Sequence, residues 1–135
     1  MNTKEILLAI AERRKKLGMP LRVLSRLAGT SRPTLCRVLG GDLKAARHDR
    51  VINILRATGI RIRTDDEGEC HLDPIPAEEF VARQAQKQAR TIVYLTHGTM
   101  PLESQAVSQD FMAEMVGDTT RKLLAGPKRD LWEVS

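Results

Sequence analysis

Apolar residues recur at three- and four-residue steps through most of this chain, and this pattern predicts a mainly helical protein. Thr3 is the expected N-cap of the first helix and Gly18 its expected end. In the second helix, Val23, Leu24 and Leu27 are expected to face the core. The first half of the chain contains four predicted helices, at residues 3–17, 20–28, 32–39 and 48–58.

The pattern changes after the fourth helix. Residues 60–63 alternate as a strand does, and residues 69–72 can return as its partner in a hairpin. The proline-containing segment Asp73–Pro76 is the best boundary in the chain. Two more helices are expected beyond it, at 77–97 and at 108–125, the latter capped by Ser108. The predicted organisation is a head at 1–63, a hairpin or linker at 64–76 and a helical region at 77–135.

Charge is distributed unevenly along the chain. Residues 1–64 contain 15 basic and 4 acidic side chains, a net charge of +11. Residues 65–135 contain 7 basic and 13 acidic side chains, a net charge of −6. A basic half joined to an acidic half suggests a polyanion-binding module attached to a different kind of region.

Composition and motifs disfavour several classes of protein. No apolar run approaches the roughly 18 residues that a membrane span needs. Two cysteines cannot build a disulfide framework, so a cytoplasmic protein with reduced thiols is expected. We recognise no nucleophile–base–carboxylate set, phosphate-cradling glycine loop or metal-ligand spacing. We therefore expect neither an enzyme nor a cofactor or metal site.

The most informative stretch runs from Leu21 to Leu39. Two short amphipathic helices meet there at a tight turn, where Gly29 allows the bend and Ala28 allows the helices to approach closely. Because such a pair is not stable alone, the first and fourth helices must cover it. The outer face of the third helix then remains polar, basic and free, and a helix of this size fits the major groove of duplex DNA.

This stretch resembles the helix-turn-helix of the Cro and phage-repressor family, also called the XRE family, and the likeness covers about residues 3–63. The matching positions are Leu24, Ala28, Gly29, Thr30, Ser31, Thr34, Leu35 and Val38. The resemblance implies a mainly α fold with a lambda-repressor-like head, followed here by a small β-hairpin and a C-terminal helical region. It also implies a homodimeric transcriptional repressor that binds a double-stranded DNA operator.

The resemblance also assigns base-reading residues to the third helix. Arg32 and Arg37 are the natural readers, because arginine can bond a guanine edge in two places. The family's base-reading positions correspond to Ser31, Arg32, Pro33, Cys36 and Arg37.

Phosphate contacts are expected around this helix. Ser31 and Thr34 can bond phosphates through their hydroxyls. The family often begins the first of the two helices with glutamine where this chain has Leu21, so Arg22 is the candidate phosphate contact there. The basic residues after the third helix resemble the family's backbone clamp, namely Lys44, Arg47 and Arg50.

Three other features each have two interpretations. Cys36 is either a small apolar contact in the groove or a redox switch. Cys70 and His71 are either ordinary strand residues or a weak zinc signal without a second ligand pair. Arg61 and Arg63 either pair within the hairpin or touch DNA.

The C-terminal region also has two interpretations. Its long apolar stripe can pack onto the helix at 108–125 within one chain, form a dimer or partner surface, or do both, and Trp132 either covers a helix end or anchors that surface. The stripe consists of Phe80, Val81, Ala85, Ala89, Ile92, Val93 and Thr96. If it mediates dimerisation, a fragment ending near Pro74 folds but stays monomeric.

A second hypothesis makes this chain the antitoxin of a toxin–antitoxin pair. Short XRE-like proteins with an extra C-terminal arm often belong to such pairs. In that case the acidic C-terminal half neutralises a basic toxin protein, and the head autoregulates its own operon.

Overall fold

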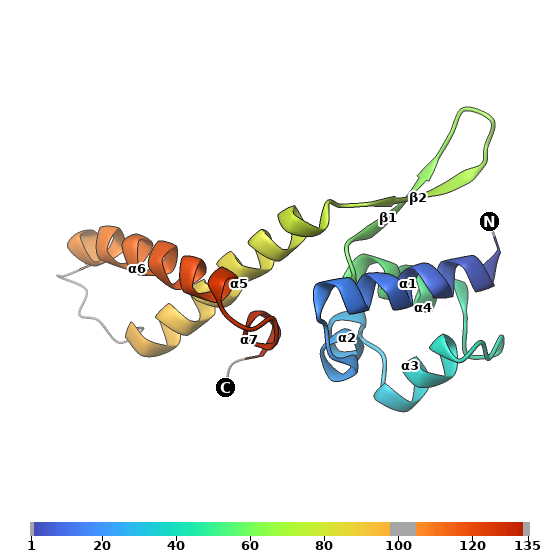
Figure 1. Ribbon diagram of the computed structural model, residues 1–135, viewed down its shortest axis with the longest axis horizontal. Helices are drawn as coiled ribbons and strands as arrows, with labels where there is room; N and C mark the ends of the chain where they lie inside the picture. The colour runs from blue at the N-terminus through green and yellow to red at the C-terminus, as the bar shows by residue number, and fades with distance from the viewer. Residues whose placement is uncertain (1, 98–104, 134–135) are drawn as a thin grey trace. The chain divides into compact units, whose positions relative to one another are not determined.

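The computed structural model describes residues 2–97 and 105–133, which form a mainly helical protein with one two-stranded antiparallel sheet (Figure 1). The chain divides into two compact units, Met1–Ala77 and Glu78–Ser135. The hairpin thus belongs to the first unit. The elements are α1 (Thr3–Leu17), α2 (Leu21–Ala28), α3 (Arg32–Leu39), α4 (His48–Ala57), β1 (Ile60–Thr64), β2 (Cys70–Pro74), α5 (Ala77–His97), α6 (Gln105–Ala125) and α7 (Arg129–Trp132).

Helix α1 is capped one residue earlier than the sequence predicts. Asn2, not Thr3, is the N-cap: its side chain accepts a hydrogen bond from the Glu5 amide, and the Glu5 carboxylate accepts one from the Asn2 amide. This reciprocal capping box satisfies two backbone donors that the helix would otherwise leave unpaired. Gly18 ends the helix in the left-handed conformation, at φ 64°, as expected.

The four helices of the first unit enclose an aliphatic core. Helix α2 packs against α3 and α4, α1 contacts α3, and α4 contacts β1. The fully buried side chains include Ile10, Leu17, Leu24, Leu35 and Ile54. The expectation that Leu27 faces this core is wrong, because its side chain is 42% exposed. Helix α2 is only eight residues long, and the positions it can bury are set by the neighbours it packs against.

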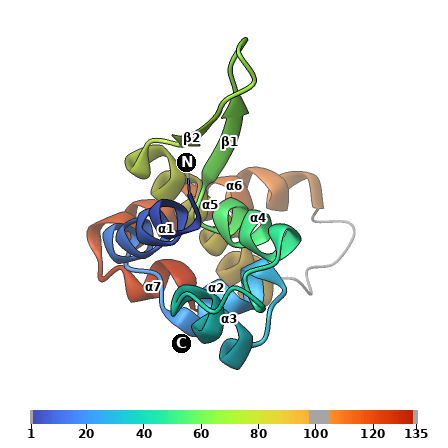
Figure 2. The same ribbon diagram turned by 90° about the vertical axis from the view of Figure 1, so that its right-hand side faces the viewer.

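The hairpin pairs β1 with β2 from Ile60 opposite Pro74 to Thr64 opposite Cys70. Its turn is held by Asp65, whose carboxylate accepts hydrogen bonds from the amides of Glu67 and Glu69. Only Ile60, at the base, is buried in β1. In Figures 1 and 2 the turn end of the hairpin stands clear of the four helices of the same unit.

A buried arginine ties the first unit together. The Arg13 side chain is 8% exposed and donates hydrogen bonds to two carbonyl oxygens, through Nε to Thr58 at 2.9 Å and through Nη2 to Ile75 at 2.5 Å. Burial lowers the pKa of its guanidinium. Arg13 therefore joins α1 to the end of α4 and to the residue that follows the hairpin.

The second unit is built on α5, whose bounds agree with the predicted helix at 77–97. Helix α6 begins at Gln105, so Ser108 lies inside the helix and is not its cap. The short helix α7 has no counterpart among the predicted elements. The expected break at residues 98–101 lies outside the described residues.

Trp132 of α7 is a core residue of the second unit. It is 2% exposed, and its ring lies 6.2 Å from that of Phe80 on α5, between centroids. Two glutamines of α5 fasten the same segment, because Gln84 and Gln88 donate to the carbonyls of Leu131 and Asp130. In the apolar stripe, Ala85, Ala89 and Val93 are buried and Phe80, Val81 and Ile92 are half-buried. Thr96, at its end, is exposed.

The division into units changes the charge picture. Residues 78–135 carry 7 basic and 8 acidic side chains, a net charge of −1. Most of the negative charge assigned to the C-terminal half comes from the hairpin and its turn, which contribute Asp65, Asp66, Glu67, Glu69 and Asp73. An attraction of the second unit for a basic toxin protein therefore has no support in its net charge.

Candidate nucleic-acid interface

Capping hydrogen bonds and a proline define the two ends of helix α3. The Ser31 hydroxyl accepts a hydrogen bond from the Thr34 amide and caps the helix. Pro33 lies in the first turn, where a missing amide proton removes no helical hydrogen bond. At the other end, the Gly40 amide bonds to the Cys36 carbonyl.

The inner and outer faces of α3 differ in exposure. Leu35 and Val38 are fully buried against the rest of the unit. The four side chains on the outer face are all exposed: Arg32, Pro33, Cys36 and Arg37. The separation agrees with the helical spacing of these residues, and it leaves two arginines on a surface about two helical turns long.

The turn between α2 and α3 depends on a small residue and a glycine. Ala28 is 5% exposed, and Gly29 adopts φ 66°, a left-handed conformation that side-chain-bearing residues rarely adopt. The Gly29 and Thr30 amides bond back to the Arg26 and Ser25 carbonyls, which closes α2. Any larger residue at position 29 would strain the backbone even though open space surrounds it.

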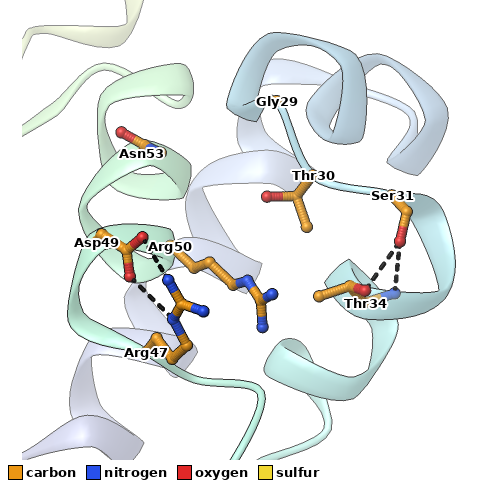
Figure 3. A pocket seen from close by; sticks show the side chains of 8 residues that line it. All are labelled: Gly29, Thr30, Ser31, Thr34, Arg47, Asp49, Arg50 and Asn53. Atoms are coloured by element: carbon orange, nitrogen blue, oxygen red, sulfur yellow. Dashed lines mark hydrogen bonds and ion pairs between the residues drawn. The ribbon is translucent and has the colours of Figure 1, made fainter.

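A polar pocket of about 360 Å³ lies between this turn and the first half of α4 (Figure 3). We call it the α3–α4 pocket. It is lined by Gly29, Thr30, Ser31, Thr34, Arg47, Asp49, Arg50 and Asn53.

Hydroxyl groups form one side of the α3–α4 pocket. The Ser31 hydroxyl donates to Thr34 Oγ1 over 2.8 Å. Because Thr34 Oγ1 serves as the acceptor in that bond, its own proton can be donated to a ligand. An oxyanion in the pocket would therefore meet a hydroxyl donor at the start of α3.

Two guanidinium groups form the opposite side. The half-buried Arg50 side chain reaches into the middle of the pocket, where its Nη1 donates to the Ala45 carbonyl over 3.3 Å (Figure 3). Arg47 pairs with Asp49, through Nη2 to Oδ2 at 3.1 Å. That pairing, mainly its hydrogen bond, lowers the pKa of the Asp49 carboxyl. Two cations and one anion give the lining a net charge of +1, which suits a single phosphate.

The structure brings together only some of the predicted site residues. Ser31, Thr34, Arg47 and Arg50 line the α3–α4 pocket. Arg32, Pro33, Cys36 and Arg37 lie on the outer face of α3. Arg22 is exposed on α2 and Lys44 is exposed in the loop before α4, and neither lines the pocket.

Sequence reasoning missed Asp49 and Asn53. Both lie on the pocket side of α4, where positions 49, 50 and 53 are three and four residues apart. That spacing was a usable signal, because it places the two polar residues on the same side as Arg50.

The hairpin turn holds a second group of polar side chains. His71 Nε2 forms a 2.7 Å hydrogen bond with an Asp65 carboxylate oxygen. This hydrogen bond is the main reason that the pKa of the Asp65 carboxyl is lowered. Potential metal-ligand atoms of Asp65, Glu69 and His71 lie within 4.8 Å of one another. Cys70 is not part of this group. Both cysteines are free and exposed.

Arg61 lies 3.9 Å from the carboxylate of Asp73 across the hairpin.

No helix in the described ranges, 2–97 and 105–133, is both long and apolar enough to cross a membrane. No protein-family model, curated protein or solved structure was found to match this chain.

Proposed function

We propose that this chain is a sequence-specific double-stranded DNA-binding transcription regulator, whose α2–turn–α3 segment acts as a helix-turn-helix of the Cro and phage-repressor type. The observation that carries the proposal is the outer face of α3. Its polar residues are all exposed, while Leu35 and Val38 on the opposite face of the same helix are fully buried. The buried face of such a helix fixes its position in the unit, and the exposed face can enter a major groove.

The α3–α4 pocket supports the same function. It lies beside the start of α3, so a backbone phosphate bound by Arg50 and Thr34 would fix the register of the helix in the groove. Arg32 and Arg37 would then meet base edges, where each guanidinium can bond a guanine through two donors. Two copies on a near-palindromic operator would place their α3 helices one DNA turn apart, roughly 34 Å. Occlusion of a promoter would make the dimer a repressor.

Arg32→Ala and Arg37→Ala test this proposal directly. Preferred duplexes are first selected from a random library with the full chain. Each variant is expected to lose about 1–3 kcal/mol of affinity for the selected duplex and to relax the preference at one base pair. Arg90→Ala, which removes an exposed arginine from α5, is the matched control and should bind as the parent does. Unchanged affinity and base preference in both α3 variants would refute this mode of docking.

Lys44→Ala and Arg50→Gln should behave differently. Both residues are assigned to phosphate, so each variant is expected to weaken binding to all duplexes about equally. The plot of log affinity against log salt concentration should become shallower by about 0.9 for each phosphate that the variant no longer neutralises. Titrations of selected and random duplexes at several salt concentrations measure both quantities. If base preference changed while the salt dependence stayed constant, these residues would be reading bases instead.

A further inference from the structure

The ion pair between Arg47 and Asp49 lies inside the α3–α4 pocket, where the proposed function requires an anion to bind (Figure 3). Two hydrogen bonds join the side chains, from Nη2 to Oδ2 at 3.1 Å and from Nε to Oδ1 at 3.4 Å. Asp49 also lies in the first turn of α4, where a negative charge is stabilised by the helix dipole. The ion pair with Arg47 and the dipole of α4 therefore both stabilise the Asp49 carboxylate at the N-terminus of this helix.

An entering phosphate competes with this carboxylate. Both groups are anions, and Asp49 already accepts from Nε and Nη2 of Arg47, so a phosphate can bind that edge of the guanidinium only by displacing the carboxylate. The remaining cation of the pocket, Arg50, has no carboxylate within ion-pairing distance among the described residues, and it bonds only weakly to a carbonyl. Arg50 is thus ready for phosphate, whereas Arg47 must first leave Asp49.

We infer that Asp49 competes with DNA phosphate for Arg47 and thereby sets the affinity of the pocket for the DNA backbone. This inference rests on the proposed function. In the free protein Arg47 is paired with Asp49, so the first phosphate is bound by Arg50 and the Thr34 hydroxyl. The pair is easily rearranged because its two side chains are 61% and 63% exposed. Asp49 is then an affinity-determining residue that does not itself contact DNA.

The test compares Asp49→Asn with Asp66→Asn on a fluorescent duplex of random sequence. Both substitutions remove one negative charge, but Asp66 lies exposed in the hairpin turn and does not line the pocket. Asp49→Asn is expected to raise affinity about 3- to 10-fold near 0.1 M salt, since Arg47 becomes available to one more phosphate. The salt dependence should steepen by about 0.9. Asp66→Asn should change affinity less than about twofold, as a distant charge is screened at this salt concentration.

A second pair of variants isolates Arg47. Arg47→Ala alone is expected to weaken binding, because it leaves the Asp49 carboxylate unpaired in the pocket. The double variant Arg47→Ala/Asp49→Asn should bring affinity and salt dependence back to about those of the parent, since the gain from Asp49→Asn is made through Arg47. Asp49→Ser, which keeps a residue suited to the start of a helix, provides a second variant in case Asn disturbs α4. Thermal melting followed by circular dichroism shows that each variant is folded.

The outcomes separate this inference from the proposed function. Equal increases in affinity from Asp49→Asn and Asp66→Asn would show a general effect of net charge and would overturn the role of Asp49. A double variant that binds more tightly than the parent would overturn it as well, while leaving DNA binding intact. If the parent chain retained no duplex even at low salt, the proposed function would fail and this inference with it.

Discussion

Replacing Arg13 with methionine is expected to lower the free energy of unfolding of the first unit by about 2–4 kcal/mol. Methionine keeps an aliphatic stem of similar length but donates no hydrogen bonds. The carbonyl of Thr58 would be left without this donor in a buried region and that of Ile75 in a half-buried one, and an unpaired buried carbonyl costs about 1–3 kcal/mol. Typical domains are stable by only about 5–15 kcal/mol, so this is a large fraction of the total. Arg13→Lys keeps the charge but has fewer donors, so its free energy of unfolding should lie between those of the parent and of Arg13→Met.

Urea unfolding can resolve this effect because Trp132, the only tryptophan, belongs to the second unit. Its fluorescence follows the second unit, while far-ultraviolet circular dichroism follows the helices of both. The variant should therefore shift the dichroism transition and leave the fluorescence transition unchanged. Lys15→Met is the matched control, since it removes an exposed charge two residues further along the same helix. Equal midpoints for Arg13→Met and Lys15→Met would show that the buried bonds contribute nothing.

A fragment of residues 1–77 is expected to fold alone and to bind the operator much more weakly than the full chain. The fragment must extend beyond Pro74, because the Ile75 amide bonds to Gly59 and its carbonyl accepts from Arg13. We expect the dimer interface in residues 78–135, where Tyr94, Leu95 and Leu124 leave large apolar side chains exposed. The fragment should therefore be a monomer that binds one half-site. Joining two half-sites through one dimer can strengthen binding about 10²- to 10⁴-fold, and a monomeric fragment would lack that advantage.

Sedimentation and gel-shift titrations of the fragment and the full chain measure these two properties on the same selected duplex. Circular dichroism of the fragment provides the control for folding. A fragment that is dimeric and binds the full site as tightly as the intact chain would place the dimer interface within Met1–Ala77. The second unit would then be free for another partner, which would favour the antitoxin hypothesis.

Local sequence rules determined most of the secondary structure. Helix α3 and helix α5 have the bounds that the apolar spacing predicted, because regular periodicity and strong end signals agree there. Gly18 and Gly29 end their helices in the left-handed conformation that glycine adopts at low cost. The exposure of Arg32 and Arg37 also followed from spacing, since Leu35 and Val38 on the other face had to be buried.

Which polar groups meet depends on how the helices pack against one another. Arg13 had the same local signature as its basic neighbours, and its burial depends on carbonyls 45 and 62 residues away. The α3–α4 pocket arises because α4 packs beside the α2–α3 turn, which brings Asp49 and Arg50 near Thr34. Leu27 is exposed and Trp132 is buried for a related reason: an apolar side chain is buried only where another element covers it. The positions of the longer helices and most of their buried faces could be predicted because they depend on interactions a few residues apart, whereas α7, the pocket and the buried arginine depend on long-range packing.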